Sequence, residues 1–169
     1  MMNRVVLLIG GNKGDRQALI EQATVLIQQR IGTVVAVSTV YEAEPWGNFE
    51  AENEKRKVGS FLNRALLVET SLSAHEVLGE ALAIEKDLGR ERQQLSTFNS
   101  QISTRKYHSR PMDIDLIFYN DAVIDTPDLT IPHPRAHLRR FVLEPLAEIM
   151  PDYRHPIFGK TVKELLAEV

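Results

Sequence analysis

The chain has 169 residues, of which 43% are hydrophobic and 25% charged, and its formal net charge is −3 at pH 7. This composition is typical of a globular protein, and the lack of cysteine excludes disulfide bonds, thiolate nucleophiles and cysteine-ligated metals. The longest apolar run, residues 5–9, is far shorter than a membrane span of about 20 residues, and no signal peptide precedes it. We therefore expect a cytoplasmic protein with one domain (1–169) and no membrane span. The net charge also gives no reason to expect a nucleic-acid partner.

The first part of the chain predicts a strand, a helix and two further strands. Residues 5–9 form a β-branched apolar run that is typical of a fully buried strand. Asp15 can cap a helix whose apolar residues recur every three or four positions and which ends near Gly32. Residues 33–41 and 61–69 are predicted as the second and third strands, with a long polar loop between them.

The second part predicts a helix, a fourth strand, a hairpin and two terminal helices. Ser73 and Glu76 have the spacing of a capping box, and the helix that they begin is expected to end at Gly89, which favours the left-handed conformation of a helix terminus. Asp113 and Asp115 share one face of the fourth strand, 112–119, because alternate residues of a strand point the same way. The opposite face is predicted to hold Met112, Ile114, Leu116 and Phe118.

This order of elements predicts the fold class. A core of β-α-β-β-α-β is typical of an α+β, ferredoxin-like sandwich with an antiparallel sheet. Residues 123–131 are expected to add an accessory hairpin, and residues 141–149 and 162–169 are expected to form C-terminal helices.

Two long segments, 42–60 and 90–111, fit no regular element and carry opposite charge. The first contains five glutamates between residues 42 and 54, whereas the second contains five basic residues and one acidic residue. Structureless loops longer than about 12–15 residues are uncommon and are often functional.

Asp113 and Asp115 are candidate metal ligands. Two carboxylates on one strand face repel one another unless a cation or a proton lies between them, and Mg²⁺ prefers such oxygen ligands while keeping positions for water and phosphate. A solvated strand face with two ordinary acids remains an alternative for this pair alone. The neighbouring basic residues, Arg90, Arg92 and Arg110 among them, favour a triphosphate site, because metals and arginines together neutralise phosphate charge.

Other motifs are weaker on their own. Residues 10–15 match neither dinucleotide nor P-loop templates and are interpreted as a tight turn. Trp46 stands between proline and glycine in a polar loop, where it can be a core residue or a stacking surface for a flat ring. Asn63 can offer an amide donor and acceptor to the edge of a heterocycle.

Several segments in this order resemble the 6-hydroxymethyl-7,8-dihydropterin pyrophosphokinase family of folate biosynthesis. The resemblance covers nearly the whole chain, and its most specific part is an R-x-x-D-x-D-x-x-x-[FY] motif from Arg110 to Tyr119, followed by Ile131-Pro132-His133-Pro134-Arg135. The other matching segments are 9–12, 41–47, 61–65, 84–92 and 139–146.

The resemblance implies an ATP-dependent pyrophosphokinase that transfers pyrophosphate from ATP to 6-hydroxymethyl-7,8-dihydropterin and releases AMP. It implies two Mg²⁺ ions held by Asp113 and Asp115, with Arg90 and Arg110 as further catalytic residues. The pterin-binding set that it implies is Ala43, Glu44, Trp46, Phe61, Asn63 and Phe141. The ATP-binding set is Glu85, Arg90, Arg92, Tyr107, Arg110, Leu116, Thr130, His133 and Arg139. We further expect a monomer.

Two other functions remain open at this point. A ferredoxin-like ligand-sensing or RNA-binding module would need no paired carboxylates beside arginines, and residues 61–69 lack the basic-aromatic pattern of an RNA-recognition motif. A nucleotidyltransferase would also use an Asp-x-Asp pair with Mg²⁺, but it would release pyrophosphate rather than AMP.

Overall fold

The computed structural model describes residues 2–12, 14–43, 61–93 and 112–169, with only the backbone of residues 43 and 90–93. The elements in chain order are β1 (Asn3–Gly11), α1 (Arg16–Arg30), β2 (Thr33–Val37), β3 (Tyr41–Ala43), β4 (Phe61–Thr70), α3 (Ala74–Gln93), β5 (Asp113–Tyr119), β6 (Ile124–Thr126), β7 (Leu129–Ile131), a short 3-10 helix (Ala136–Leu138), α5 (Arg140–Ile149) and α6 (Val162–Ala167).

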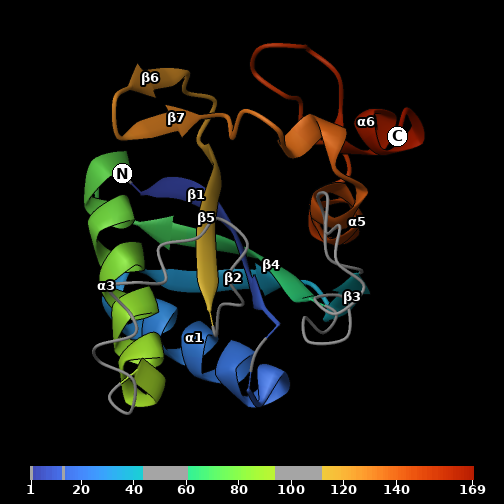
Figure 1. Ribbon diagram of the computed structural model, residues 1–169. Coiled ribbons are helices and arrows are strands. Elements are labelled where there is room, and N and C mark those ends of the chain that lie inside the picture. The colour runs from blue at the N-terminus through green and yellow to red at the C-terminus, as the bar shows by residue number, and fades with distance from the viewer. Residues whose placement is uncertain (1, 13, 44–60, 94–111) are drawn as a thin grey trace.

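The main sheet has the strand order β2-β4-β1-β5, with β3 pairing beside β2 on β4, and the described pairs are all antiparallel. Two helices, α1 and α3, connect its core strands (Figure 1). The prediction of an α+β protein with an antiparallel sheet is therefore confirmed, and the strand order is consistent with the ferredoxin-like arrangement. The accessory hairpin is also present, as β6 and β7.

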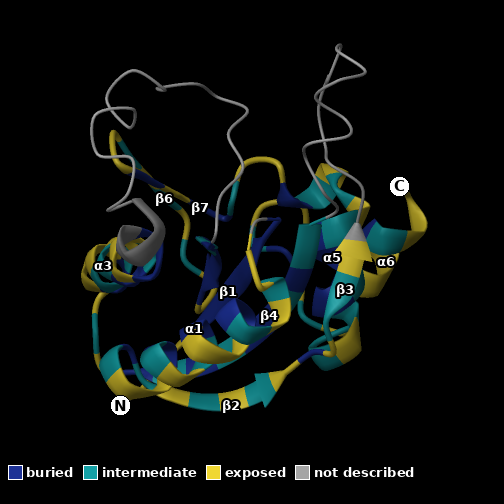
Figure 2. Ribbon diagram, turned by 60° about the horizontal axis from the view of Figure 1, so that its bottom comes forward, coloured by how far each residue is buried: buried dark blue, intermediate teal, exposed yellow. Residues whose placement is uncertain are grey.

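Helices cover both faces of the sheet, which explains the unbroken apolar run of β1. Val5, Leu7 and Ile9 pack into the layer of α1 and α3, whereas Val6 and Leu8 pack against α5 and α6. Figure 2 shows the buried strands between these two layers. None of the helices in the described ranges has the length and apolarity needed to cross a bilayer.

A register shift in β5 corrects one prediction about its faces. Val6 pairs with Phe118, but the next residue, Leu7, pairs with Leu116, so that Ile117 is the extra residue of a β-bulge. Phe118 therefore belongs to the core on the α5 side rather than to the face of Ile114 and Leu116, as the alternation predicted. The bulge is tied down by a hydrogen bond from the His133 N–H to the Ile117 carbonyl, at 3.0 Å.

The predicted strand 33–41 is two strands, β2 and β3, because Ser38 interrupts it. The Ala65 N–H donates to the Ser38 side-chain oxygen at 2.9 Å, and the Ser38 N–H donates to the Ala65 carbonyl at 2.9 Å. A side chain thus takes one of the hydrogen bonds that a continuous ladder would use.

The second predicted helix begins as expected but ends later. Its capping box is present, with the Ser73 N–H donating to Glu76 at 2.8 Å and the Glu76 N–H donating to Ser73 at 3.2 Å. The expected end at Gly89 is wrong, because α3 continues to Gln93. The following residues, Arg90 to Gln93, favour helix strongly enough to overcome the cost of about 1 kcal/mol for an internal glycine.

Candidate active site

A row of four residues crosses the sheet at the end nearest the candidate metal ligands. Tyr41 pairs with Asn63, Asn63 with Gly10, and Gly10 with Asp113. Directly paired residues project from the same face of a sheet, and Asp115 pairs with Leu8, which packs on the α5 side. Asn63, Asp113 and Asp115 therefore share the face that α5 covers, and the predicted common face of the two aspartates is confirmed.

Gly10 allows this row to form. A Cβ atom at this position would collide with the Leu62 carbonyl and lie 2.6 Å from Asn63 Oδ1. The Asn63 side chain thus packs directly against the backbone of Gly10, which has no side chain. Asn63 is 6% exposed, and no described residue accepts a hydrogen bond from its Nδ2. A buried donor without an acceptor costs free energy, so this amide is suited to a ligand that supplies the acceptor.

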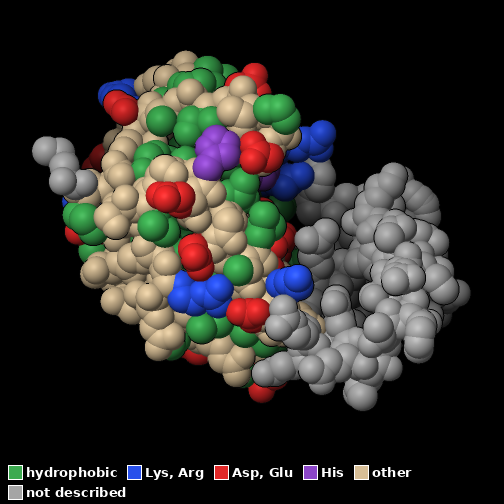
Figure 3. Space-filling view, turned by 90° about the vertical axis from the view of Figure 1, so that its left-hand side faces the viewer, with side chains coloured by type: hydrophobic (Ala, Val, Ile, Leu, Met, Phe, Trp, Pro, Cys, Tyr) green, Lys and Arg blue, Asp and Glu red, His purple; other side chains and the backbone are tan. Residues whose placement is uncertain are grey.

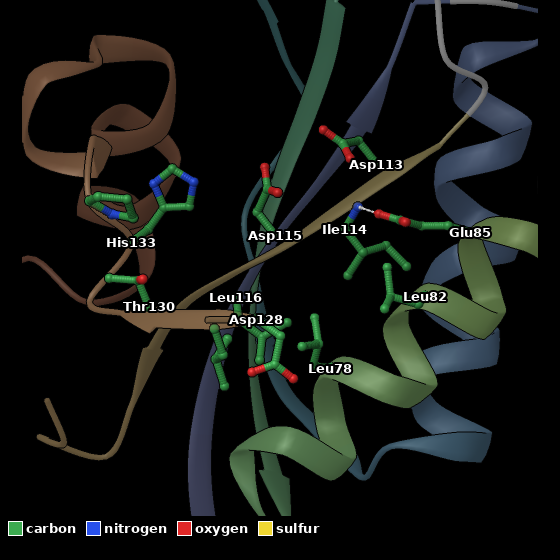
Figure 4. Close-up of a pocket in the computed structure, with 12 residues that line it drawn as sticks. Leu78, Leu82, Glu85, Asp113, Ile114, Asp115, Leu116, Asp128, Thr130 and His133 are labelled. Carbon is green, nitrogen blue, oxygen red and sulfur yellow. Dashed lines mark hydrogen bonds between the residues drawn. The ribbon is translucent and has the colours of Figure 1, made fainter. Parts of the chain in front are cut away.

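A cavity of about 310 Å³ lies along β5, which is the edge strand of the sheet. Figure 4 shows Asp113 and Asp115 on β5, Glu85, Leu82 and Leu78 on α3, and Thr130 and His133 on the opposite wall. The lining residues are Leu78, Leu82, Glu85, Asp113, Ile114, Asp115, Leu116, Asp128, Leu129, Thr130, His133 and Pro134. Asp113, Asp115 and Glu85 make one end of the cavity acidic, and apolar side chains with Asp128 line the other end (Figure 4).

Glu85 joins α3 to the edge of β5. Its Oε2 accepts a hydrogen bond from the Ile114 N–H at 2.6 Å (Figure 4), which satisfies an amide that the edge strand would otherwise expose. The pKa of Glu85 is raised to about 8, chiefly by burial and also by Asp113 and Asp115, although the hydrogen bond from Ile114 lowers it. Three carboxyl groups therefore converge here, and the raised pKa means that Glu85 keeps its proton at neutral pH beside the two aspartates.

The donor set fits Mg²⁺ better than a softer metal. Within the described ranges, no group of three or more His, Asp or Glu side chains could hold a metal ion, so this part of the chain offers the two half-buried aspartates. Mg²⁺ is commonly bound by one or two carboxylates together with water and substrate phosphates. Asp113 and Asp115 thus fit the ion that the sequence predicted, provided that a polyphosphate completes its coordination.

His133 and Arg139 add a polar and a positive group beside the aspartates. Burial lowers the pKa of His133, as does Arg139, while Asp113 raises it. The Arg135 N–H donates to His133 Nδ1 at 3.2 Å, which leaves Nε2 to carry the proton of the neutral ring. Burial also lowers the pKa of Arg139, whereas the negative charge of Asp115 raises it; an arginine nevertheless remains charged.

Two of the predicted aromatic walls lie on the α5 side of the sheet. Phe61 begins β4 and pairs with Ala43 on β3, two residues before Asn63 and therefore on the same face. Phe141 lies in the first turn of α5 and packs against the core on that side. The Arg139 guanidinium lies 5.7 Å from the centre of the Phe141 ring, so the positive group and the aromatic wall lie side by side.

The structure places the predicted residues in two groups. Glu85, Asp113, Asp115, Leu116, Thr130 and His133 line the cavity, and Phe61, Asn63, Phe141 and Arg139 lie on the α5 side. The predictions for Glu44, Trp46, Tyr107 and Arg110 fall outside the described residues, and the side chains of Ala43, Arg90 and Arg92 are not described.

Sequence reasoning missed several residues of the site. Gly10 was interpreted as part of a turn, although glycine within a strand indicates a close approach of other groups. The other missed residues line the cavity: Leu78, Leu82, Ile114, Asp128, Leu129 and Pro134. Their spacing on a helix, strand or hairpin is the same as that of ordinary surface and core positions, so no sequence signal separates them.

Comparison with known proteins bears directly on this site. A family model described as 7,8-dihydro-6-hydroxymethylpterin-pyrophosphokinase (HPPK) matches residues 6–151. The chain belongs to the HPPK family. A pyrophosphokinase of Aquifex aeolicus is 36% identical over 167 residues, covering 99% of this chain and 92% of the relative. The corresponding protein of Bacillus subtilis is 37% identical over 150 residues, covering 88% of this chain and 79% of the relative.

Solved structures support the fold. A Plasmodium falciparum HPPK-DHPS variant crystallised with STZ-DHP matches with a TM-score of 0.71 at 16% identity, covering 99% of this chain. The chain spans 45% of that longer protein. The HPPK membership, the pyrophosphokinase class and the α+β fold that the sequence predicted are therefore confirmed.

Proposed function

We propose that this HPPK transfers the pyrophosphoryl group of ATP to the hydroxymethyl oxygen of 6-hydroxymethyl-7,8-dihydropterin, with AMP as the second product. The observation that carries the proposal is the row of Asn63, Gly10 and Asp113 across three strands. It places an amide suited to a heterocycle about 10 Å from a carboxylate suited to Mg²⁺, since each strand spacing is about 4.8 Å.

The pterin slot lies over the α5 face of the sheet. Asn63 provides a buried amide, and Phe61 and Phe141 provide aromatic surfaces from β4 and α5. A pterin is flat and has a polar edge, so stacking surfaces with one precisely placed amide are what its recognition requires. Ala43, Glu44 and Trp46 complete this proposed set.

The nucleotide occupies the cavity along β5. Leu116 and Thr130 lie with Glu85 along its walls, and His133 and Arg139 face the phosphates. Mg²⁺ held by Asp113 and Asp115, two ions in the proposed complex, supplies neutralisation of phosphate charge and alignment of the reacting groups. Arg90, Arg92, Tyr107 and Arg110 belong to the proposed ATP-binding set, with Arg90 and Arg110 acting on the transferred phosphates.

The reaction requires positioning and charge stabilisation rather than a covalent nucleophile. The substrate hydroxyl attacks the β-phosphorus and loses its proton to solvent, the bond from that phosphorus to the oxygen that it shares with the α-phosphorus breaks, and AMP leaves with that oxygen. Arg139 and the Nε2–H of His133 donate to phosphate oxygens as negative charge shifts toward the leaving group. The cavity walls from α3 and the β6–β7 hairpin exclude water from the phosphates.

The proposal extends to the whole molecule. We infer a monomer that forms one domain over residues 1–169 and works in the cytoplasm without a nucleic-acid partner. Sedimentation at micromolar concentration, with and without substrates, tests the monomer; a stable dimer would contradict it.

Identification of the nucleotide product is the decisive test. Incubation with ATP, Mg²⁺ and 6-hydroxymethyl-7,8-dihydropterin is expected to yield AMP and the pterin diphosphate in equal amounts. Release of pyrophosphate with a pterin nucleotide would instead indicate nucleotidyl transfer. AMP formation that does not depend on the pterin would also contradict the proposal.

A further inference from the structure

Glu148, near the end of α5, binds the connection between β2 and β3. The Thr39 N–H donates to both carboxylate oxygens at 3.1 Å, and the Thr39 hydroxyl donates to Oε1 at 2.9 Å. The Tyr41 hydroxyl donates to the same oxygen at 2.9 Å. Hydrogen bonds to a charged acceptor are stronger than those between neutral groups, so one carboxylate holds two residues of the neighbouring segment.

These contacts fasten β3 to α5 rather than to its own sheet alone. β3 is only three residues long, and both of its ends pair with residues of the proposed pterin slot: Tyr41 with Asn63, and Ala43 with Phe61. Figures 1 and 2 both show β3 beside α5. A strand this short gains little stability from its ladder, so the contacts with Glu148 contribute to its position.

The same helix carries another wall of the slot. Phe141 and Glu148 are seven residues apart on α5, which is two turns and about 10 Å along one side of the helix. The start of α5 therefore carries the aromatic ring of Phe141, and the end of α5 is bound through Glu148 to the segment that leads into β3. Arg64 holds the connection from the opposite side, since its Nε donates to the Ser38 carbonyl at 3.1 Å.

Electrostatics agree with a charged anchor. Burial raises the pKa of Glu148, but the hydrogen bonds from Tyr41 and Thr39 outweigh it, so the net pKa is lowered. The hydrogen bond to Glu148, followed by burial, raises the pKa of Tyr41. The carboxylate is therefore ionised and the phenol protonated at neutral pH, which is the combination that the hydrogen bond needs.

We infer that Glu148 is a positioning residue for the pterin slot. It determines the width of the slot by fixing the distance between Phe141 on α5 and the paired strands β3 and β4. The inference rests on the proposed function. Glu148 lies at the far end of α5 from Phe141 and acts through Thr39 and Tyr41, so its effect on catalysis is indirect. Its loss allows α5 to shift relative to β3 and loosens the slot without touching the cavity along β5.

Steady-state kinetics with each substrate varied in turn tests this inference. Glu148→Ala is expected to raise the KM for the pterin by about tenfold, which is less than the loss of about hundredfold in rate that a misplacement of 1 Å can cause. The KM for ATP is expected to rise less than that for the pterin, because the residues that line the cavity along β5 lie outside α5 and Arg139 lies at the end of that helix far from Glu148. Glu148→Gln keeps an acceptor for Thr39 and Tyr41 and is expected to restore most of the pterin affinity.

Matched variants keep the test specific. Glu168→Ala removes an exposed carboxylate that pairs with Lys160 at 2.6 Å and is expected to leave both KM values unchanged. Tyr41→Phe removes one of the hydrogen bonds to Glu148 and is expected to raise the pterin KM less than Glu148→Ala. The two changes together are expected to cost less than the sum of their separate effects, since both act on one contact.

The outcomes separate the inference from the function on which it rests. A folded Glu148→Ala variant with an unchanged pterin KM, or with equal losses for pterin and ATP, overturns the positioning role. If Glu148→Ala does not fold, an unchanged pterin KM in Tyr41→Phe overturns it instead. A wild-type protein that makes no AMP contradicts the proposed function itself, whereas an active wild type with an unaffected variant contradicts only the role of Glu148.

Discussion

Asp113 and Asp115 lie on one face of β5 although their charges repel one another. Glu85 adds a third carboxyl group, and the three are held together by the pairing of β5 with β1 and by the hydrogen bond from Ile114 to Glu85. Such like-charge clusters reduce the stability of the folded protein and are retained where function needs them. The residues that favour activity here are therefore expected to oppose stability.

Replacement of Asp113 separates these two effects. Asp113→Asn is expected to lower turnover by about two to three orders of magnitude, the range found when one group that stabilises transition-state charge is lost. The melting temperature of the metal-free variant is expected to equal or exceed that of the wild type, because repulsion with Asp115 is reduced. Kinetic assays and thermal unfolding without Mg²⁺ check both results. Asp152→Asn, an exposed control that loses a contact with Lys163, should leave turnover unchanged; equal turnover in Asp113→Asn would exclude the metal role.

Asn63 gives a second contrast between binding and stability. Asn63→Ala is expected to weaken pterin binding at least tenfold, the factor that corresponds to a hydrogen bond of about 1.4 kcal/mol. The free energy of unfolding is expected to change by less than about 1 kcal/mol, because the Nδ2 group that is lost has no acceptor within the described residues. Calorimetric titration and urea unfolding measure the two quantities. A strongly destabilised variant would show that Asn63 supports the fold instead.

The β6–β7 hairpin is an element whose position affects the nucleotide cavity. His75, near the start of α3, lies 3.2 Å from both Thr126 and Asp128 through its Nε2. The hairpin supplies Leu129 and Thr130 to the cavity. Figure 3 views this side of the molecule and shows acidic and basic side chains next to one another on it. The contact between α3 and the hairpin is exposed, so its contribution to stability is small. It nevertheless holds the hairpin wall of the cavity in place.

Removal of this contact is expected to affect ATP alone. His75→Ala should raise the KM for ATP by up to about fivefold, which corresponds to about 1 kcal/mol, the typical net value of one hydrogen bond. The KM for the pterin should remain unchanged, the opposite pattern from that expected for Glu148. Kinetics with each substrate varied in turn measure the difference. A larger effect on the pterin would contradict the division of the site into two separate halves.

At the scale of the molecule, Glu148 and Glu164 are expected to lose stabilising interactions in acid, whereas the raised pKa of Glu85 acts in the opposite direction. Burial raises the pKa of Glu148, but its hydrogen bonds from Tyr41 and Thr39 give a net decrease from the ordinary 4.5, and hydrogen bonds within the α6 capping box lower that of Glu164. A lowered folded-state pKa contributes stability above the unfolded-state value, and this contribution is lost as the pH falls through the folded-state value.

Thermal unfolding at pH 7 and below pH 4.5 tests this expectation. The double variant Glu148→Gln and Glu164→Gln is expected to be less stable than the wild type at pH 7 and to lose less stability on acidification. Glu168→Gln, outside both clusters, provides the control. Parallel acid losses in the double variant and the wild type would show that other groups control the acid limb.

The sequence predicted most of this architecture because local patterns dominate it. The apolar run of β1, the capping box of α3 and the alternation before Ile117 each agree with the structure. The strand break at Ser38 was not predicted, because it depends on a hydrogen bond from Ala65, which is distant in the sequence. The helix end at Gly89 was wrong, because the residues that follow have a high helix propensity. The pairing of Asn63, Gly10 and Asp113 could not be predicted, since register joins segments that are far apart in the chain.

The bulge at Ile117 has a consequence for changes in chain length. Without the bulge, and with Ile117 retained, each residue of β5 before Phe118 would lie on the opposite face of the sheet. Asp113 and Asp115 would then point into the core between the sheet and helices α1 and α3. Deletion of Ile117 would remove the irregularity yet keep both acids on the α5 side of the sheet. A relative that lacks the residue at position 117 can thus keep both aspartates on the same face, whereas a relative of equal length must keep the β-bulge to do so.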